Sequence, residues 1–341
     1  MMTSETEIKN CSFIKTVLML IIVFYHSILF WTGTWFTVVG KPVFECAIFK
    51  YISFWLGTFH VYTFTLISGY IFYYLKVEKQ KYSCFKIFLL NKCKRLLIPY
   101  CFISIFWIVP VKLFFEGKNI VEHLINVFLG IGGAQLWYLV MLFLVFVISY
   151  QILPLILQEN IKSRILVFLI IVICLGGNLV WNYFRIPNYF QVNNVLKHLP
   201  FFILGIKIRQ KQDLWIRKVP KILYFILDIF LCMLTFLLKK YNGLFSIFRT
   251  MIEILLNFTS VLMVFFILQK LAERLTINEK ILLFFSRRAM PIYMFHQQFI
   301  YFVIFFLNGK VTPYAHALAN FLISLFLSII ISSILLVFRT T

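Results

Sequence analysis

Six ionisable side chains stand inside long apolar stretches of this sequence. A charged group at the centre of a membrane-spanning helix costs about 2.5 to 3.5 kcal/mol on insertion scales, so each of these residues is a candidate for chemistry. The six are His26, His60, His198, Asp228, Glu253 and His296. An imidazole can take a proton as a general base or attack as a nucleophile. The histidines could instead hold helices together through hydrogen bonds; we favour chemistry for His26 and leave both interpretations open for His60 and His296.

The depth of two of these histidines follows from their spacing to a basic residue. His26 comes eleven residues after Lys15, and at about 1.5 Å of rise per residue it lies about 16 Å from a cation at the membrane surface. His296 comes eight residues after Arg288, which corresponds to about 12 Å. Since both cations are expected at the same surface, the two imidazoles could meet near the bilayer midplane.

Two further segments hold side chains suited to packing or binding. The string FHVYTFTLISGY at residues 59–70 contains His60 and, near its end, the small residues Ser68 and Gly69, which let another backbone approach closely. Three cations precede the apolar string LLIPY: Lys92, Lys94 and Arg95. Cations at this place can bind a diphosphate, or they can simply mark the cytosolic face of a membrane protein.

The elements that must position these residues are membrane-spanning helices. Hydrophobic residues make up 62% of the 341 and charged residues 13%, whereas soluble domains average about 45 to 50% apolar and about 25% charged residues. One span takes about 20 apolar residues. Such stretches lie near residues 13–31, 54–75, 96–115, 136–157, 164–181, 195–209, 219–238, 248–268, 289–307 and 314–337. The sequence therefore predicts an all-α, polytopic bundle of about ten transmembrane helices in a single integral membrane domain over residues 1–341.

Three details qualify these elements. The stretch at 195–209 is short and contains Pro200 and Gly205, so we expect it to be broken or tilted. The first stretch is not followed by a small-residue cleavage site, so we expect it to remain as a span. The seven cysteines are scattered without metal-like spacing, so we expect free packing residues and no metal site.

Basic residues predict the orientation of the chain. The formal charge of +21 would suggest nucleic acid as the partner of a soluble protein, but most of the 33 Lys and Arg residues lie in connections on one side of the predicted helices. Both termini are therefore expected in the cytoplasm, and the charge is expected to attract anionic lipid or an anionic cytosolic ligand rather than nucleic acid. The segment from Cys84 to Arg95 mixes basic residues with phenylalanine, which predicts an interfacial helix that runs into the third span.

Six strings, taken in order, resemble the bacterial acyltransferase-3 family of membrane-bound O-acyltransferases. That family has a basic residue and a histidine separated by ten intervening positions in its first helix, a second helix similar to FHMPLFFFLSGYL, and an R-x-x-R element before its third helix. The matching positions here are Lys15 with His26, residues 59–70, and Lys92 with Arg95, with Lys twice in place of Arg. The remaining strings are LWYL at Leu136 to Leu139, PFFILGI at Pro200 to Ile206 and IYMFH at Ile292 to His296.

The resemblance implies an O-acyltransferase in the bacterial inner membrane. It would move an acyl group, usually acetyl, from cytosolic acetyl-CoA to a sugar hydroxyl of a surface or exported polysaccharide, without a metal. His26 would act as base or as transient acyl carrier, with His60 and His296 as further catalytic candidates. The residues expected to bind CoA phosphates are Lys15, Lys92, Lys94 and Arg95. The residues expected to line or support the site, or to face the sugar, are Ser68, Gly69, Trp137, Tyr138, Gln297 and Gln298.

Two other classes of function fit parts of the same pattern. A transporter or flippase for a glycan or small solute could use the histidines with Asp228 and Glu253 as a proton relay, although no inverted repeat is visible. An inactive membrane scaffold is the second, and the presence of both Lys15 and His26 argues against it. The identity of the acceptor glycan stays open; capsule, O-antigen and exopolysaccharide all fit. The oligomeric state also stays open and could be a homo-oligomer. The chain resembles the stand-alone form of the family, without an appended hydrolase-like domain.

Overall fold

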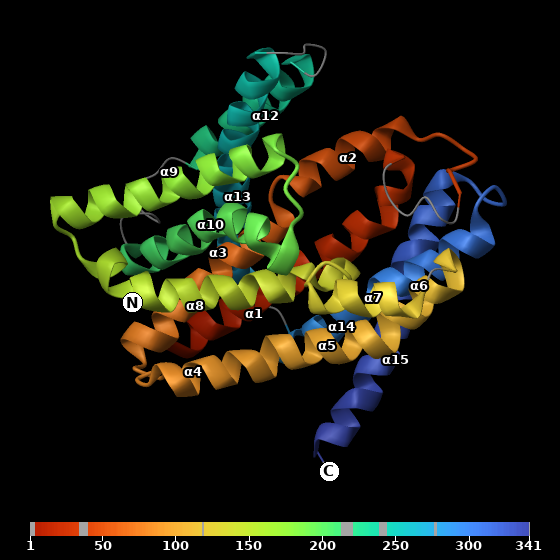
Figure 1. The fold of residues 1–341 in the computed structure, drawn as a ribbon, viewed down its shortest axis with the longest axis horizontal. Helices are drawn as coiled ribbons and strands as arrows, with labels where there is room; N and C mark the ends of the chain where they lie inside the picture. Colours follow the sequence, from red (N-terminus) through yellow and green to blue (C-terminus); the bar gives the residue numbers. More distant parts are fainter. Residues whose placement is uncertain are drawn as a thin grey trace. The chain divides into compact units, whose positions relative to one another are not determined.

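The computed structural model of the chain describes residues 4–33, 40–117, 119–212, 221–238, 244–275 and 278–340. Its described residues form helices joined by turns and short connections, with no β-strand among them (Figure 1). The chain divides into two compact units. Unit 1 comprises Met1–Phe64 and Ile216–Thr341, unit 2 comprises Thr65–Trp215, and the division falls inside one helix, α3 (His60–Tyr73).

Unit 1 is built from long helices that come from both ends of the sequence. They are α1 (Ser4–Ile28) with the 3-10 turn η1 (Leu29–Thr32), α2 (Ala47–Gly57), the start of α3, α12 (Lys221–Leu238), α13 (Leu244–Arg274), α14 (Glu279–Leu307) and α15 (Pro313–Thr340). Helices α1, α14 and α15 pack on one another around Met19, Val23 and Ile292. Helices α12 and α13 lie side by side and share the buried residues Leu231 and Leu256 (Figure 1).

Unit 2 contains the remaining helices. After α3 and the π-helical turn η3 (Tyr74–Glu78), one long helix runs through α4 (Phe85–Lys92), η4 (Cys93–Leu97), α5 (Ile98–Ile103), η5 (Ser104–Ile108) and α6 (Val109–Glu116). It is followed by α7 (Ile120–Phe128), η6 (Ala134–Leu136), α8 (Trp137–Leu157), α9 (Ile161–Tyr183), η7 (Tyr189–Gln191) and α10 (Val192–Gln210). Helices α8, α9 and α10 pack against one another.

Two prolines explain why the long helix of unit 2 is not α-helical throughout. Pro99 and Pro110 each follow a π-helical turn, η4 and η5 respectively. A proline inside a helix lacks the backbone N–H, and its ring clashes with the carbonyl four residues earlier. That carbonyl belongs to Arg95 in η4 and to Phe106 in η5, so the wider turns lie where the ring needs room. The segment from Cys84 to Arg95 continues into the third predicted span, as the sequence indicated.

The sixth predicted span was expected to be broken or tilted; the structure contradicts the break, and the tilt remains a prediction. Helix α10 is continuous across Pro200 and Gly205 rather than broken there. A side chain at Gly205 would meet the backbone carbonyl of Leu66, and one at Gly69 would meet that of Phe202. The two glycines therefore let α3 and α10 approach backbone to backbone inside unit 2, which is the close approach predicted at Gly69.

Seven helices are long and apolar enough to cross a membrane. They are Lys9–Thr32, Phe85–Glu116, Ala134–Leu157, Ile161–Tyr183, Phe248–Arg274, Glu279–Leu307 and Pro313–Leu335. Each coincides with one of the ten predicted stretches, so the chain is a multi-pass membrane protein. The other three stretches behave differently: 54–75 is divided between α2 and α3 at Thr58 and Phe59, 195–209 lies in the more polar α10, and 219–238 coincides with the shorter helix Ile222–Leu238. The number of about ten spans and the cytoplasmic termini remain predictions.

Candidate functional site

Two histidines from opposite ends of the sequence meet in unit 1. His26 lies near the end of α1 and His296 in the middle of α14, and these helices pack together. The Nδ1 atom of His26 is 3.0 Å from Nε2 of His296, and the ring centroids are 5.0 Å apart. His296 is fully buried, whereas His26 is partly exposed. The helical spacing that placed both imidazoles at similar depth thus corresponds to a direct contact.

The hydrogen bonds of this pair assign its tautomers. Nδ1 of His296 lies 3.0 Å from the backbone carbonyl oxygen of Ile292. A carbonyl oxygen can only accept, so the neutral His296 ring carries its proton on Nδ1 and has its lone pair on Nε2. The contact with His26 then requires the proton of His26 on Nδ1, which donates to Nε2 of His296. The lone pair of the His26 ring is consequently on Nε2, the atom turned away from this contact.

His60 belongs to the same group of rings. Its Nδ1 atom donates to the carbonyl oxygen of Leu56 at 2.7 Å, and the ring is buried at the start of α3. Tyr25 lies between the histidines, with its ring centroid 4.2 Å from that of His60 and 5.3 Å from that of His26. Tyr25 was not predictable from the sequence, because its contact with His60 depends on how α1 packs beside the start of α3.

The two glutamines after His296 are buried in α14. Gln297 donates its amide to the hydroxyl of Tyr301 one turn later, and Gln298 is fully buried. These contacts place both amides inside unit 1 close to His296 in sequence. Of the unit 1 candidates, the structure therefore brings His26, His60 and His296 together, while Lys15 is partly buried on the same helix as His26, three turns earlier.

The cations expected to act jointly in unit 2 have different surroundings. Lys92 is only 9% exposed, and its ammonium lies 3.4 Å from the ring centroid of Phe146 and 5.4 Å from that of Phe88. This is a cation–π arrangement, which stabilises a charge away from water. Lys94 and Arg95 are exposed in the π-helical turn η4. The structure thus separates Lys92 from the other two, because the extra residue of a π turn changes which side chains share a helix face.

A second group of candidates gathers inside unit 2, around α8, α10 and the end of α3. Trp137 and Tyr138 at the start of α8 lie 5.6 Å and 6.5 Å, by ring centroids, from His198 of α10. Nδ1 of His198 is 3.1 Å from the hydroxyl of Thr65, and the Tyr138 hydroxyl lies beside the hydroxyls of Thr65 and Ser68. Thr65 was not expected in this group from the sequence. His198 was visible only as an ionisable residue in an apolar stretch.

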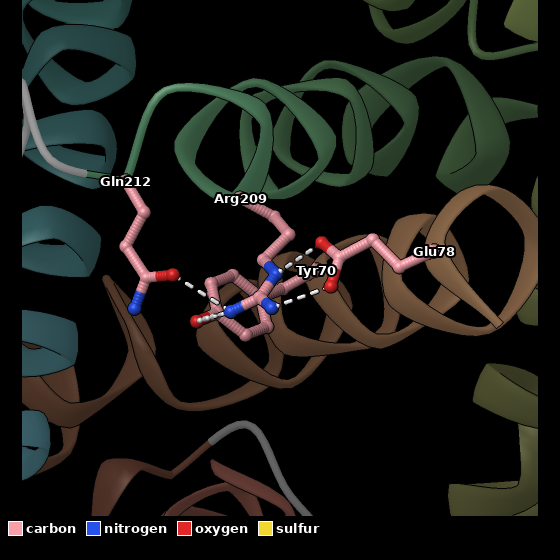
Figure 2. A network of polar contacts seen from close by, with 4 residues as sticks. All are labelled: Tyr70, Glu78, Arg209 and Gln212. Carbon is pink, nitrogen blue, oxygen red and sulfur yellow. Dashed lines mark hydrogen bonds and ion pairs between the residues drawn. The ribbon is translucent and has the colours of Figure 1, made fainter. Parts of the chain in front are cut away.

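Arg209, at the end of α10, binds side chains near the end of α3 and in η3. Arg209 makes two parallel bonds to Glu78, from Nε to Oε1 and from Nη2 to Oε2, each 2.7 Å long (Figure 2). Its Nη1 atom donates to Tyr70 at 3.1 Å and to the side-chain carbonyl of Gln212 at 2.7 Å (Figure 2). Bidentate pairing of this kind is stronger and more directional than a single ammonium contact.

Close by in the chain, α10 makes a weaker ion pair. Lys211 lies 3.1 Å from Glu159, which stands in the connection between α8 and α9. The hydrogen bond from Lys211 and its positive charge lower the pKa of the Glu159 carboxyl. Glu159 is exposed and Lys211 is partly exposed, so this pair contributes little to stability compared with Arg209 and Glu78.

The acidic residues in apolar stretches have partners of their own. Asp228 of α12 is buried and accepts hydrogen bonds from Trp55 and Ser260. Glu253 of α13 pairs with Arg249 one turn earlier, at 3.5 Å. The recorded partners of these two acidic residues are thus Trp55, Ser260 and Arg249. Within the described part of the chain, no three His, Cys, Asp or Glu residues are grouped as metal ligands.

Comparison with known proteins identifies the family. The model of the acyltransferase-3 family, described as an acyltransferase domain, matches residues 9–337. No curated protein and no solved structure matches the chain. The family match covers both units and contains every candidate residue discussed above. The chain therefore belongs to the acyltransferase-3 family and is a multi-pass membrane acyltransferase.

Proposed function

We propose that this acyltransferase moves an acetyl group from cytosolic acetyl-CoA to a sugar hydroxyl of a surface or exported polysaccharide, in the inner membrane of a bacterium. The observation that carries the proposal is the hydrogen-bonded sequence from the carbonyl of Ile292 through His296 to His26. It orients one imidazole by a second side chain, a role that a third group plays for the histidine of catalytic triads.

His26 can serve this reaction in two ways. As a general base, Nε2 takes the proton of the sugar hydroxyl while that oxygen attacks the thioester carbonyl, and the CoA thiolate leaves. As an acyl carrier, Nε2 attacks the thioester carbonyl first and the CoA thiolate leaves; the sugar hydroxyl then loses its proton to solvent, its oxygen takes the acyl group, and Nε2 regains its lone pair. In both routes the His26 ring becomes positively charged, and its Nδ1–H bond to His296 stabilises that charge and fixes the orientation of the ring.

The remaining candidates receive supporting roles in this proposal. Lys15, Lys94 and Arg95 would bind the CoA phosphates, because two are exposed and phosphates favour charge-assisted hydrogen bonds. Lys92 would act through its charge, since its ammonium is held over aromatic rings. Gln297 and Gln298 would contact the sugar, and the cluster of Ser68, Gly69, Trp137 and Tyr138 would support the acceptor path. His60 would assist His26 through Tyr25.

Deletion and complementation in the native host test the proposal. The surface glycans are examined by proton NMR for O-acetyl signals in the deletion strain, complemented with wild type, His26→Ala or His123→Gln at matched protein levels. His123 is a buried histidine of α7 in unit 2 and controls for loss of an imidazole elsewhere. We expect signals with wild type and His123→Gln but not with His26→Ala. Full acetylation with His26→Ala would refute the role of His26, and unchanged acetylation with impaired glycan export would favour a transporter.

The two routes through His26 are separated by leaving the acceptor out. Purified protein is incubated with labelled acetyl-CoA alone and then quenched, and peptides containing His26 are analysed by mass spectrometry. An acyl carrier retains the label on His26 in the absence of acceptor, whereas a general base does not. The His296→Phe variant serves as the control, because it removes the hydrogen-bond acceptor for His26 Nδ1.

A further inference from the structure

Two buried side chains of α15 hold polar atoms that the proposed acyl transfer does not use. His316 and Asn320 lie one turn apart in this helix and are 2% and 0% exposed. Within the part of the chain that the structure describes, neither Nε2 of His316 nor Oδ1 of Asn320 has a hydrogen-bond partner. Buried polar atoms in folded proteins are almost always hydrogen-bonded, so two such atoms on one helix face require an explanation.

The other contact of His316 decides what kind of atom Nε2 is. The backbone carbonyl oxygen of Val303 in α14 accepts a hydrogen bond from the ring, and since Nε2 has no partner, the donor is Nδ1. A neutral imidazole carries one proton, so Nε2 holds a lone pair and is an acceptor. The rings of Phe30 and Trp31 lie 6.1 Å and 5.2 Å from that of His316, by centroids. A charged imidazolium would be costly between such apolar neighbours.

Asn320 also presents an acceptor, for a different reason. Its Nδ2 atom donates to the backbone carbonyl oxygen of Ser27 at 3.0 Å, near the end of α1. Turning the amide over would set Oδ1 against that carbonyl oxygen, with two lone pairs facing each other, so this hydrogen bond fixes the orientation of the amide. The atom of Asn320 without a partner is therefore the amide oxygen, which can only accept.

Two acceptors cannot satisfy each other, but one molecule with two donor hydrogens can satisfy both. Residues four apart on a helix share a face, with Cβ atoms about 5 to 6 Å apart. Two hydrogen bonds of about 2.8 Å each span a similar distance. We propose that His316 and Asn320 bind one water molecule, which donates one hydrogen to Nε2 and the other to Oδ1. An ammonium ion also has two donors, but its charge would be costly at a buried place between aromatic rings.

This water site belongs entirely to unit 1 and joins α15 to the helix that carries His26. The water occupies Oδ1 of Asn320, and Nδ2 of the same amide holds the carbonyl of Ser27, the residue that follows His26. Buried waters of this kind are a fixed part of a fold, because they complete hydrogen bonds that no side chain completes. The inference does not depend on the proposed acyl transfer, since neither acceptor takes part in it.

Nitrogen NMR of the purified full-length protein, with isotope-labelled histidine, tests the water directly. An imidazole nitrogen that accepts a hydrogen bond resonates at lower frequency than one with a free lone pair. We expect Nε2 of His316 at the hydrogen-bonded position, with magnetisation transfer from water protons. The signal is assigned through the backbone of neighbouring residues, so this measurement needs no variant. A free lone pair, a protonated Nε2, or a bonded signal without transfer from water would each overturn the proposal.

Substitutions test whether the two acceptors share one ligand. His316→Phe and Asn320→Leu each remove one acceptor and leave the water one bond short, so each should lower the unfolding temperature. The double variant needs no water, and its loss should be clearly smaller than the sum of the two. Asn320→Leu with Ser324→Ala is the matched control, because Ser324 is equally buried one turn further along α15 and donates to the carbonyl of Phe321. We expect additive losses in the control pair. Additive losses in both pairs would show that His316 and Asn320 share no ligand.

Discussion

The contact between His26 and His296 joins the residues whose spacing first suggested chemistry. This contact is asymmetric, because Nδ1 of His296 donates to the backbone carbonyl of Ile292. His296 therefore offers His26 only an acceptor atom, Nε2. A neutral imidazole in this place orients His26 but stabilises a positive charge less than a carboxylate would. We therefore interpret His296 as a positioning residue and His26 as the group that reacts.

This interpretation predicts different effects of two substitutions at His296. His296→Phe keeps an aromatic ring but removes the acceptor of the His26 proton, and we expect acyl transfer to slow by about 10²-fold or more, the range typical of lost acid–base support. His296→Gln retains a side-chain carbonyl that can accept the same proton and should recover part of the rate. The measurement is the rate of O-acetyl appearance on the glycan at matched protein levels. Equal losses in both variants would argue for simple packing.

At the scale of elements, α3 and α10 approach each other backbone to backbone within unit 2. Gly205→Ala places a methyl group against the carbonyl of Leu66, so the helices must separate. We expect a loss of about 1 to 3 kcal/mol in the free energy of unfolding, typical of overpacking. Thermal unfolding in detergent measures the change.

The control for this prediction is a glycine of α9 with open space around it. A Cβ atom at Gly176 would have no neighbour within 4 Å, so Gly176→Ala should leave stability unchanged or raise it by about 0.5 to 1 kcal/mol through helix propensity. If both alanine variants behaved alike, the close contact of α3 and α10 would not limit stability.

The same two helices are joined at their ends by Arg209 and Glu78. Arg209→Ala should lower the free energy of unfolding by about 2 to 3 kcal/mol, since it removes bidentate charge-assisted bonds from a largely buried arginine. Lys211→Ala breaks the exposed pair with Glu159 and should leave the free energy of unfolding nearly unchanged. Each alanine variant is then combined with Glu78→Gln in a double-mutant cycle. We expect a coupling energy between Arg209 and Glu78 and none between Lys211 and Glu78. Additive effects of Arg209→Ala and Glu78→Gln would rule out a specific pair.

How far the sequence predicts these elements differs from helix to helix. Seven long apolar helices were predictable, because a span requires a run of apolar residues whatever its neighbours are. The division of 54–75 at Thr58 was not, since neither Thr58 nor Phe59 is a helix breaker. The burial of Lys92 was not predictable either. Which side chains of its helix point inward depends on a π turn, and a downstream proline causes that turn.

For the candidate site, helical rise along α1 and α14 was enough to predict that His26 and His296 lie at similar depth. The partners of Asp228 could not be predicted from the sequence. Trp55 and Ser260 are ordinary residues of apolar helices, and only tertiary packing brings them together.

At the scale of the whole molecule, the orientation of the chain is open to a direct test. Cys84 is exposed and precedes α4, in a segment predicted to face the cytoplasm. In a variant retaining only this cysteine, we expect a membrane-impermeant thiol reagent to label it in permeabilised but not in intact spheroplasts. Lys41→Cys in the same background, an exposed position predicted on the opposite side, should label in both. The reverse pattern would invert the topology and remove the cytosolic access assumed for the CoA-binding cations.

The paired π turns of the long unit 2 helix have a consequence for sequence change. Each holds one residue more than an α-helix would need, and one residue corresponds to about 100° of rotation. Deletion of a single codon within residues 93–97 would therefore remove the surplus residue and restore a continuous α-helix with Lys92 on about its present face, whereas loss of the π turn without a deletion would rotate Lys92 by about 100°. Homologues one residue shorter in this segment would present the same face of α4 to Phe146, so an alignment gap here would mark the loss of a π turn rather than a change of the buried face.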